Sequence, residues 1–87
     1  MTERIDKSEL VRLVVQRTGL DAETVGAIID ATLEEIYEAL KRLEPVSLRD
    51  FGTFYVREER SRWVFKFNPS QRLRALFGWS STYRGKR

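Results

Sequence analysis

The spacing of apolar residues near the start of the chain predicts a short amphipathic helix. Leu10, Leu13 and Val14 fall on one face at helical spacing. Asp6 precedes them as an N-cap residue, and Gly19 follows them as a residue that can close a helix in the left-handed conformation. The first predicted helix therefore lies between these two caps.

A wider apolar stripe follows and predicts a second helix of about twenty residues. We expect this helix to begin at Asp21 and to end before Pro45, because the residue before a proline disfavours the helical conformation. A short first helix cannot cover so wide a stripe, so a second subunit, the sheet of the same chain, or both should cover it. The stripe consists of Val25, Ile28, Ile29, Thr32, Leu33, Ile36, Leu40 and Leu43.

Beyond Pro45 the apolar pattern changes to a period of two, which is typical of strands. Apolar and polar residues alternate over 46–49 and 54–57, and over 63–67 the aromatic residues Trp63, Phe65 and Phe67 alternate with Val64 and Lys66. The polar segment 58–62 should contain the reversal between the second and third strands.

The segment after the third strand predicts one more short helix. Asn68, Pro69 and Ser70 should end the strand, and Ser70 can cap a helix that Gly78 stops. The order of elements predicts an α+β fold. It comprises two N-terminal helices, a three-stranded antiparallel sheet with a short hairpin, and a short C-terminal helix. We expect one domain over residues 1–78 and a basic tail over 79–87.

The composition excludes several kinds of chemistry. The chain has 87 residues with no cysteine and no histidine, so it lacks the usual zinc ligands, thiol nucleophiles and imidazole bases. No apolar run is long enough to cross a membrane. We therefore expect a protein that is not an enzyme, carries no metal or cofactor, and is not embedded in a membrane.

Charge is distributed unevenly along the chain. The first 51 residues hold seven Lys or Arg and eleven Asp or Glu, a net charge of −4, whereas residues 52–87 hold nine and two, a net charge of +7. A basic half that is interleaved with aromatic residues favours a polyanionic partner such as nucleic acid.

Several short segments are distinctive in their order and spacing. They are Lys7-Ser8-Glu9-Leu10, Arg17-Thr18-Gly19-Leu20, Val46-Ser47-Leu48, Phe51-Gly52-Thr53-Phe54, Val56-Arg57-Glu58 and Phe67-x-Pro69 with Leu73 and Arg74. Together these segments resemble the HU/IHF family of bacterial nucleoid proteins. The resemblance implies an intertwined homodimer that binds double-stranded DNA and is cytoplasmic and nucleoid-associated.

The chain also departs from the family pattern. The family carries a long β-ribbon arm with a proline at its tip, which wedges between base steps and kinks DNA. Here the segment between Arg62 and Phe67 is too short for such an arm. Asp50 replaces a glycine of the family's turn, and Glu59 stands where a basic residue is common. We therefore expect DNA binding with little bending.

Basic residues near the hairpin and at both ends of the chain are the candidate DNA contacts. Arg62 and Lys66 are the favoured phosphate contacts, while Arg57 and Arg60 either contact phosphate or pair with neighbouring glutamates. The candidate DNA-binding residues are Arg57, Arg60, Arg62, Lys66, Arg72, Arg74, Lys7, Arg84, Lys86 and Arg87. The candidate core and dimer-interface residues are Ile29, Leu33, Ile36, Leu40, Phe51, Phe54 and Phe67.

Two alternatives to duplex binding remain open. One is an adaptor with the HU fold that has lost DNA binding and contacts another protein. The other is binding of single-stranded nucleic acid, in which Trp63 and Phe65 would stack on bases instead of joining the core.

Overall fold

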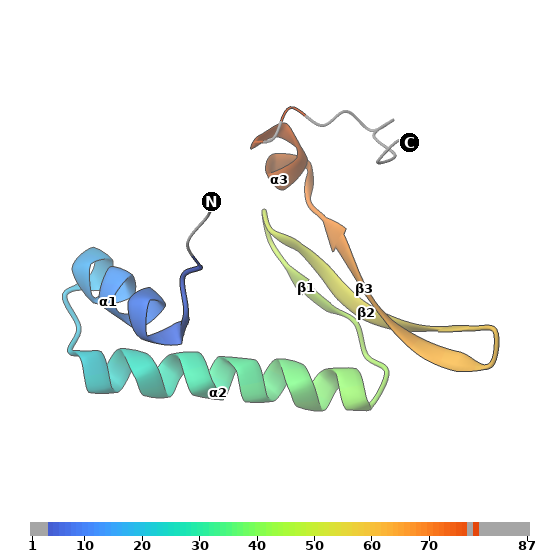
Figure 1. Cartoon of the computed structure of the whole chain (residues 1–87), viewed down its shortest axis with the longest axis horizontal. Coiled ribbons are helices and arrows are strands. Elements are labelled where there is room, and N and C mark those ends of the chain that lie inside the picture. Colours follow the sequence, from blue (N-terminus) through green and yellow to red (C-terminus); the bar gives the residue numbers. More distant parts are fainter. Residues whose placement is uncertain (1–3, 77, 79–87) are drawn as a thin grey trace. The chain divides into compact units, whose positions relative to one another are not determined.

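The computed structural model describes residues 4–76 and residue 78, and it contains three helices and three strands in that part of the chain (Figure 1). The elements are α1 (Lys7–Thr18), α2 (Ala22–Lys41), β1 (Val46–Leu48), β2 (Gly52–Glu59), β3 (Arg62–Pro69) and α3 (Gln71–Leu76). This order confirms the predicted α+β fold. The chain forms two compact units, residues 1–35 and residues 36–87, which we describe separately.

The two ends of α1 are fixed by local sequence, as predicted. The Asp6 carboxylate accepts a hydrogen bond from the Glu9 backbone N–H at 3.0 Å, which satisfies one of the unpaired donors at the start of the helix. At the other end Gly19 adopts φ 80°, and its N–H donates to the Val15 carbonyl at 2.8 Å. A glycine is needed there because the left-handed conformation is costly for residues with a Cβ.

Helix α2 is capped by different interactions at its two ends. Asp21 accepts hydrogen bonds from the Thr24 backbone N–H at 3.0 Å and from the Thr24 hydroxyl at 2.8 Å. These bonds stabilise the carboxylate and lower the pKa of Asp21 below its ordinary value. The helix ends before Pro45, as predicted, through Leu43 at φ 62° and a bond from the Glu44 N–H to the Ala39 carbonyl at 2.9 Å.

The three strands form one antiparallel sheet in the order β1-β2-β3 (Figure 1). Glu59 pairs with Arg62, so only Arg60 and Ser61 connect β2 to β3. Both connecting residues have positive φ, 54° and 68°, as a type I′ hairpin turn requires. The reversal therefore lies inside the predicted segment 58–62.

Strand β3 runs farther than the sequence predicted. We expected Asn68 to end it, but Asn68 pairs with Thr53 and Pro69 pairs with Gly52. Proline is compatible with this position because β3 is an edge strand and Pro69 is its last residue, so no inward-facing N–H is lost.

Gly52 is required at the first position of β2, where this strand pairs with the end of β3. It is buried, with φ 154°, and a Cβ built on it would lie 2.6 Å from the Asn68 carbonyl oxygen and 2.7 Å from the Phe67 ring. Asp50, two residues before Gly52, has φ 65°, a conformation that aspartate tolerates better than most residues. The turn between β1 and β2 is therefore fixed by close packing as well as by backbone conformation.

Phenylalanine rings cluster on the sheet. The Phe54 ring centroid lies 4.8 Å from that of Phe67 and 6.0 Å from that of Phe65, and Phe51 lies 5.7 Å from Phe67. Such offset aromatic pairs are stabilising beyond their area. Even so, Phe51, Phe65 and Phe67 are exposed, so one chain does not enclose this cluster.

Burial within one chain is low throughout the described residues. Val25, at 2% exposure, is the one buried hydrophobic side chain in that part of the molecule. Of the predicted core and interface residues on α2, Ile29, Ile36 and Leu40 are half-buried and Leu33 is 57% exposed. A chain with so little interior is expected to be marginal by itself.

Candidate nucleic-acid interface

The register of the hairpin separates cationic from aromatic side chains. Arg57 pairs with Val64, Glu59 with Arg62, and Tyr55 with Lys66. Directly paired residues share one side of a sheet and successive residues alternate, so Arg57, Glu59, Arg62 and Lys66 lie on one side. We call these four residues the basic face.

The opposite side of the hairpin is apolar. Phe54 pairs with Phe67, Val56 with Phe65, and Glu58 with Trp63, so the rings lie across the sheet from the basic face. We call Phe54, Val56, Trp63, Phe65 and Phe67 the aromatic face. Trp63 is 60% exposed and Phe65 is 58% exposed. A strand of nucleic acid cannot stack on these rings and contact the basic face at the same position, which weighs against the single-strand alternative.

Glu59 lies at the turn end of the basic face and holds two of its cations. The Arg57 Nε donates to Glu59 Oε2 at 2.9 Å, and the same guanidinium makes a second contact with that oxygen through its terminal nitrogen. The Lys66 ammonium lies 3.1 Å from Glu59 Oε2. Hydrogen bonds from Arg57 and then from Lys66 lower the pKa of Glu59, and the bond to Glu59 raises the pKa of Arg57. Both shifts favour the charged forms of Glu59 and Arg57.

The remaining hairpin arginines have no such partner. Arg60 lies in the turn and Arg62 begins β3, and both are exposed. Across residues 4–76 and 78, neither forms an ion pair with a carboxylate. Their guanidinium groups can reach an external anion without losing an internal contact.

Of the two arginines on α3, one is held by internal hydrogen bonds and the other has no carboxylate partner in the described chain. The helix is capped by Ser70, whose hydroxyl accepts from the Leu73 N–H at 3.1 Å, as predicted. Arg74 bonds back to the Pro69 carbonyl at 3.2 Å and to the Asn68 side-chain oxygen at 2.8 Å, so it fastens α3 to the end of β3. Arg72 makes no ion pair within the described chain.

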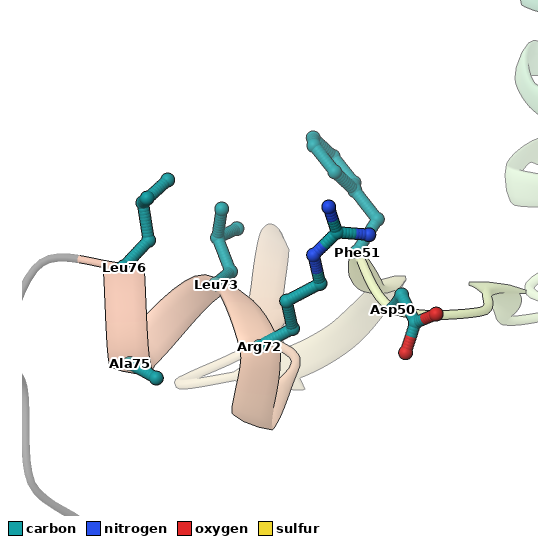
Figure 2. Close-up of a pocket in the computed structure, with 6 residues that line it drawn as sticks. All are labelled: Asp50, Phe51, Arg72, Leu73, Ala75 and Leu76. Carbon is teal, nitrogen blue, oxygen red and sulfur yellow. The ribbon is translucent and has the colours of Figure 1, made fainter.

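A shallow pocket of about 520 Å³ lies between α3 and the turn before β2. Figure 2 shows Arg72 extending from α3 toward Phe51, with Asp50 beside it in the turn. The apolar part of the lining comes from Phe51, Leu73, Ala75 and Leu76. The Asp50 carboxylate gives this pocket mixed charge, so it is a poorer phosphate site than the free arginines of the hairpin.

The candidate residues at the two ends of the chain have different outcomes. Lys7 forms an ion pair with Asp30 at 2.7 Å and thereby links α1 to α2. Arg84, Lys86 and Arg87 lie outside the described residues.

Two partners were missed by sequence reasoning, namely Asp30 for Lys7 and Glu59 for Lys66. The sequence carried no local signal for either, because each pair joins two different elements. The pairing of Arg57 with Glu59 was an open alternative and is the one observed.

Neither a cluster of metal ligands nor a membrane-spanning helix is found in the described part of the chain. It contains no cluster of three or more acidic, His or Cys side chains that could hold a metal ion. Within the same residues, no helix combines the length and apolar character needed to cross a bilayer.

Comparison with known proteins identifies the family. A profile of the family "Bacterial DNA-binding protein" matches residues 5–72, so the chain belongs to this family of DNA-binding proteins. Its relatives are DNA-binding proteins and not enzymes, which confirms the expected non-enzymatic class and the resemblance to HU and IHF.

Both HU proteins and integration host factor subunits are similar to this chain. The DNA-binding protein HU of Thermus thermophilus is 37% identical over 70 residues, which are 80% of this chain and 72% of that protein. The integration host factor subunit alpha of Bordetella pertussis is 40% identical, over 83% of this chain and 78% of that protein.

Solved structures agree with the fold. HU from Thermotoga maritima is 35% identical with a TM-score of 0.72, and the match covers 83% of this chain and 97% of that chain. An Anabaena HU–DNA cocrystal structure is 26% identical with a TM-score of 0.74, covering 84% of this chain and 97% of that one.

Proposed function

We propose that this protein binds double-stranded DNA with little sequence preference, as a homodimer, through phosphate contacts and with little bending. The observation that carries the proposal is the sorting of the hairpin's cations onto one side, away from the rings, where Arg62 has no carboxylate partner in the described chain. Cations on a sheet surface neutralise phosphates and release counterions whatever the base sequence. Membership of a DNA-binding family supports the same conclusion.

Low burial in one chain supports the homodimer. The half-buried and exposed apolar residues of α2, together with the open aromatic face, need a second surface to exclude water. Two copies of the chain would place two basic faces on one particle. The residues proposed for this interface are Ile29, Leu33, Ile36, Leu40, Phe51, Phe54 and Phe67.

The shortness of the hairpin supports weak bending. Strands β2 and β3 close through Arg60 and Ser61, and neither residue is an apolar wedge of the kind that unstacks base steps. Pro69 lies at the far end of β3, paired with Gly52, so it cannot act at the tip. The DNA in the proposed complex is therefore nearly straight. Because the protein would bind DNA with little sequence preference, it would be associated with the nucleoid.

The proposed phosphate contacts are ranked by whether each side chain already has a partner within the described chain. Arg62, Arg60 and Arg72 are the principal contacts because no carboxylate in the described chain holds them. Lys7, Arg57, Lys66 and Arg74 would first have to leave an internal partner. The tail residues Arg84, Lys86 and Arg87 would add attraction that does not depend on sequence.

Arg62→Ala tests this assignment against Arg17→Ala, which removes the same charge from the exposed end of α1. We expect Arg62→Ala to weaken duplex binding for every DNA sequence. It should lower the slope of log K against log salt by about one unit for each arginine removed from a phosphate, or about two per dimer. Arg17→Ala should leave the slope unchanged. Equal slopes for the two variants would remove the hairpin from the DNA site.

A protein-binding adaptor is the second candidate function. It is favoured by the internal pairing of Arg57 and Lys66 with Glu59 and by the exposure of Trp63 and Phe65. Absence of duplex binding at low salt, on protein verified as folded and dimeric, would favour this function over the first.

A further inference from the structure

We propose that Glu59 competes with DNA phosphate for Arg57 and Lys66, and so restricts the hairpin's phosphate contacts to Arg62 and Arg60. This inference rests on the proposed function, and it identifies Glu59 as the residue that limits the protein's affinity for DNA.

The contacts of Glu59 carry the first step of the argument. One carboxylate oxygen accepts from the Arg57 Nε at 2.9 Å and lies 3.1 Å from the Lys66 ammonium. Charge-assisted contacts of this length are stronger than bonds between neutral groups. The side chains of Glu59 and Lys66 are only 34% and 32% exposed, so water and salt screen their attraction less than they screen a fully exposed pair.

The position of Glu59 carries the second step. It lies between Arg57 and Arg62 on the basic face, on the side where phosphate would approach. If Arg57 or Lys66 turned to a phosphate, the Glu59 carboxylate would remain on that surface without its partner. A like charge facing the phosphate opposes binding in addition to the lost pair.

The neighbouring residue Glu58 provides a matched control. It pairs with Trp63 and therefore lies on the aromatic side of the hairpin. It is exposed and forms no ion pair with any other described residue. Glu59→Gln and Glu58→Gln remove the same charge from adjacent positions, so their difference isolates the pairing from the general change in net charge.

The experiment is the binding of a labelled duplex of about 20–30 base pairs across a salt series by the wild type and both variants. The duplex length is chosen to be on the order of a site for one dimer. For Glu59→Gln we expect about tenfold tighter binding or more at low salt, and a salt slope steeper by about one unit for each additional phosphate that is neutralised. Glu58→Gln should tighten binding by less than about threefold, with the slope of the wild type.

A second substitution checks the same idea without relying on absolute affinity. In the wild type, Arg57→Ala should weaken binding through the charge that it uncovers on Glu59 but leave the salt slope unchanged, because Glu59 and not phosphate holds Arg57. In the Glu59→Gln background, Arg57→Ala should reverse much of the increase in affinity and part of the increase in slope. This non-additivity is the signature of a direct interaction. Additive effects would overturn the competition.

The two proposals fail in different ways. If the wild type binds DNA and the two glutamine variants behave alike, the role of Glu59 is wrong and the proposed function stands. If only Glu59→Gln binds, the competition is supported in its strongest form. If no form of the protein binds duplex at low salt, DNA binding itself is wrong, and the inference fails with it.

Discussion

Replacing Gly52 with alanine should destabilise the protein, whereas the same replacement at Gly26 should stabilise it. A Cβ at Gly52 would lie 2.6 Å from the Asn68 carbonyl oxygen and 2.7 Å from two atoms of the Phe67 ring. A Cβ at Gly26, within α2, would meet nothing within 4 Å apart from its chain neighbours and the helix's own backbone. One chemical change therefore has opposite consequences at two positions.

The expected loss of stability in Gly52→Ala has two sources, backbone strain and steric overlap. Its φ of 154° is a conformation that residues with a Cβ rarely adopt, and holding a residue there costs about 1–3 kcal/mol. The contact with Asn68 involves backbone, which cannot move aside as a flexible side chain can, and overpacking of this kind costs about 1–3 kcal/mol. From these two costs we expect the free energy of unfolding to fall by about 3 kcal/mol in Gly52→Ala. Helix propensity predicts a rise of about 0.5–1 kcal/mol in Gly26→Ala.

Gly19→Ala provides an intermediate case. Gly19 also has a left-handed conformation, with φ 80°, but a Cβ there would have no neighbour within 4 Å. Backbone strain without a clash should cost about 1 kcal/mol. The order of stability should therefore be Gly26→Ala, wild type, Gly19→Ala and Gly52→Ala.

Urea unfolding monitored by circular dichroism measures these differences. All variants should be compared at one protein concentration, because the apparent stability of a dimer depends on concentration. In thermal unfolding, about 1 kcal/mol corresponds to about 4–8 °C for a domain of this size. A Gly52→Ala protein as stable as Gly26→Ala would refute the close approach of β2 and β3 at this point.

The other predictions concern the dimer and the shape of the bound DNA. Leu33→Asp should dissociate the dimer in analytical ultracentrifugation, because Leu33 is 57% exposed in one chain and a buried unpaired charge at an interface is costly. Ala31→Asp places the same charge on the other side of α2 and should leave the dimer intact. If the Leu33→Asp and Ala31→Asp variants dimerise equally strongly, the proposed interface is wrong. A duplex labelled at both ends should keep nearly the same energy transfer when the protein binds, since the hairpin has no apolar wedge at its tip. A large rise in transfer at saturation would show strong bending and contradict this expectation.

Local chemistry explains which parts of the fold could be predicted from the sequence. The caps of α1, α2 and α3 depend on a single residue and its neighbours, and Asp6, Gly19 and Ser70 act as predicted. The alternating pattern also indicated the strands, because apolar residues at a period of two mark one side of a sheet.

Turns without glycine or asparagine were harder to locate. The hairpin reverses at Arg60 and Ser61, and α2 closes at Leu43, although these residue types rarely adopt positive φ. The sequence could therefore give only a five-residue window, 58–62, for the hairpin turn. Strand pairing, which is a tertiary effect, fixed the turn within that window.

The candidate site was predictable only in part, for a related physical reason. The number of cations near the hairpin is a property of the sequence, but their availability depends on the partners that the fold supplies. Glu59 meets Lys66 only when β2 and β3 pair, and Lys7 meets Asp30 only when α1 and α2 pack together. Residue type therefore predicted where positive charge gathers but not which cations are free.

Binding of a labelled duplex of about 20–30 base pairs by the wild-type protein across a salt series tests the central claim most directly. The dimeric state should be verified in the same buffer. The account predicts micromolar or tighter binding at low salt that weakens steeply and linearly on a log–log plot as salt rises, equally for unrelated sequences. A folded dimer that fails to bind at low salt, or that binds with no dependence on salt, would contradict it.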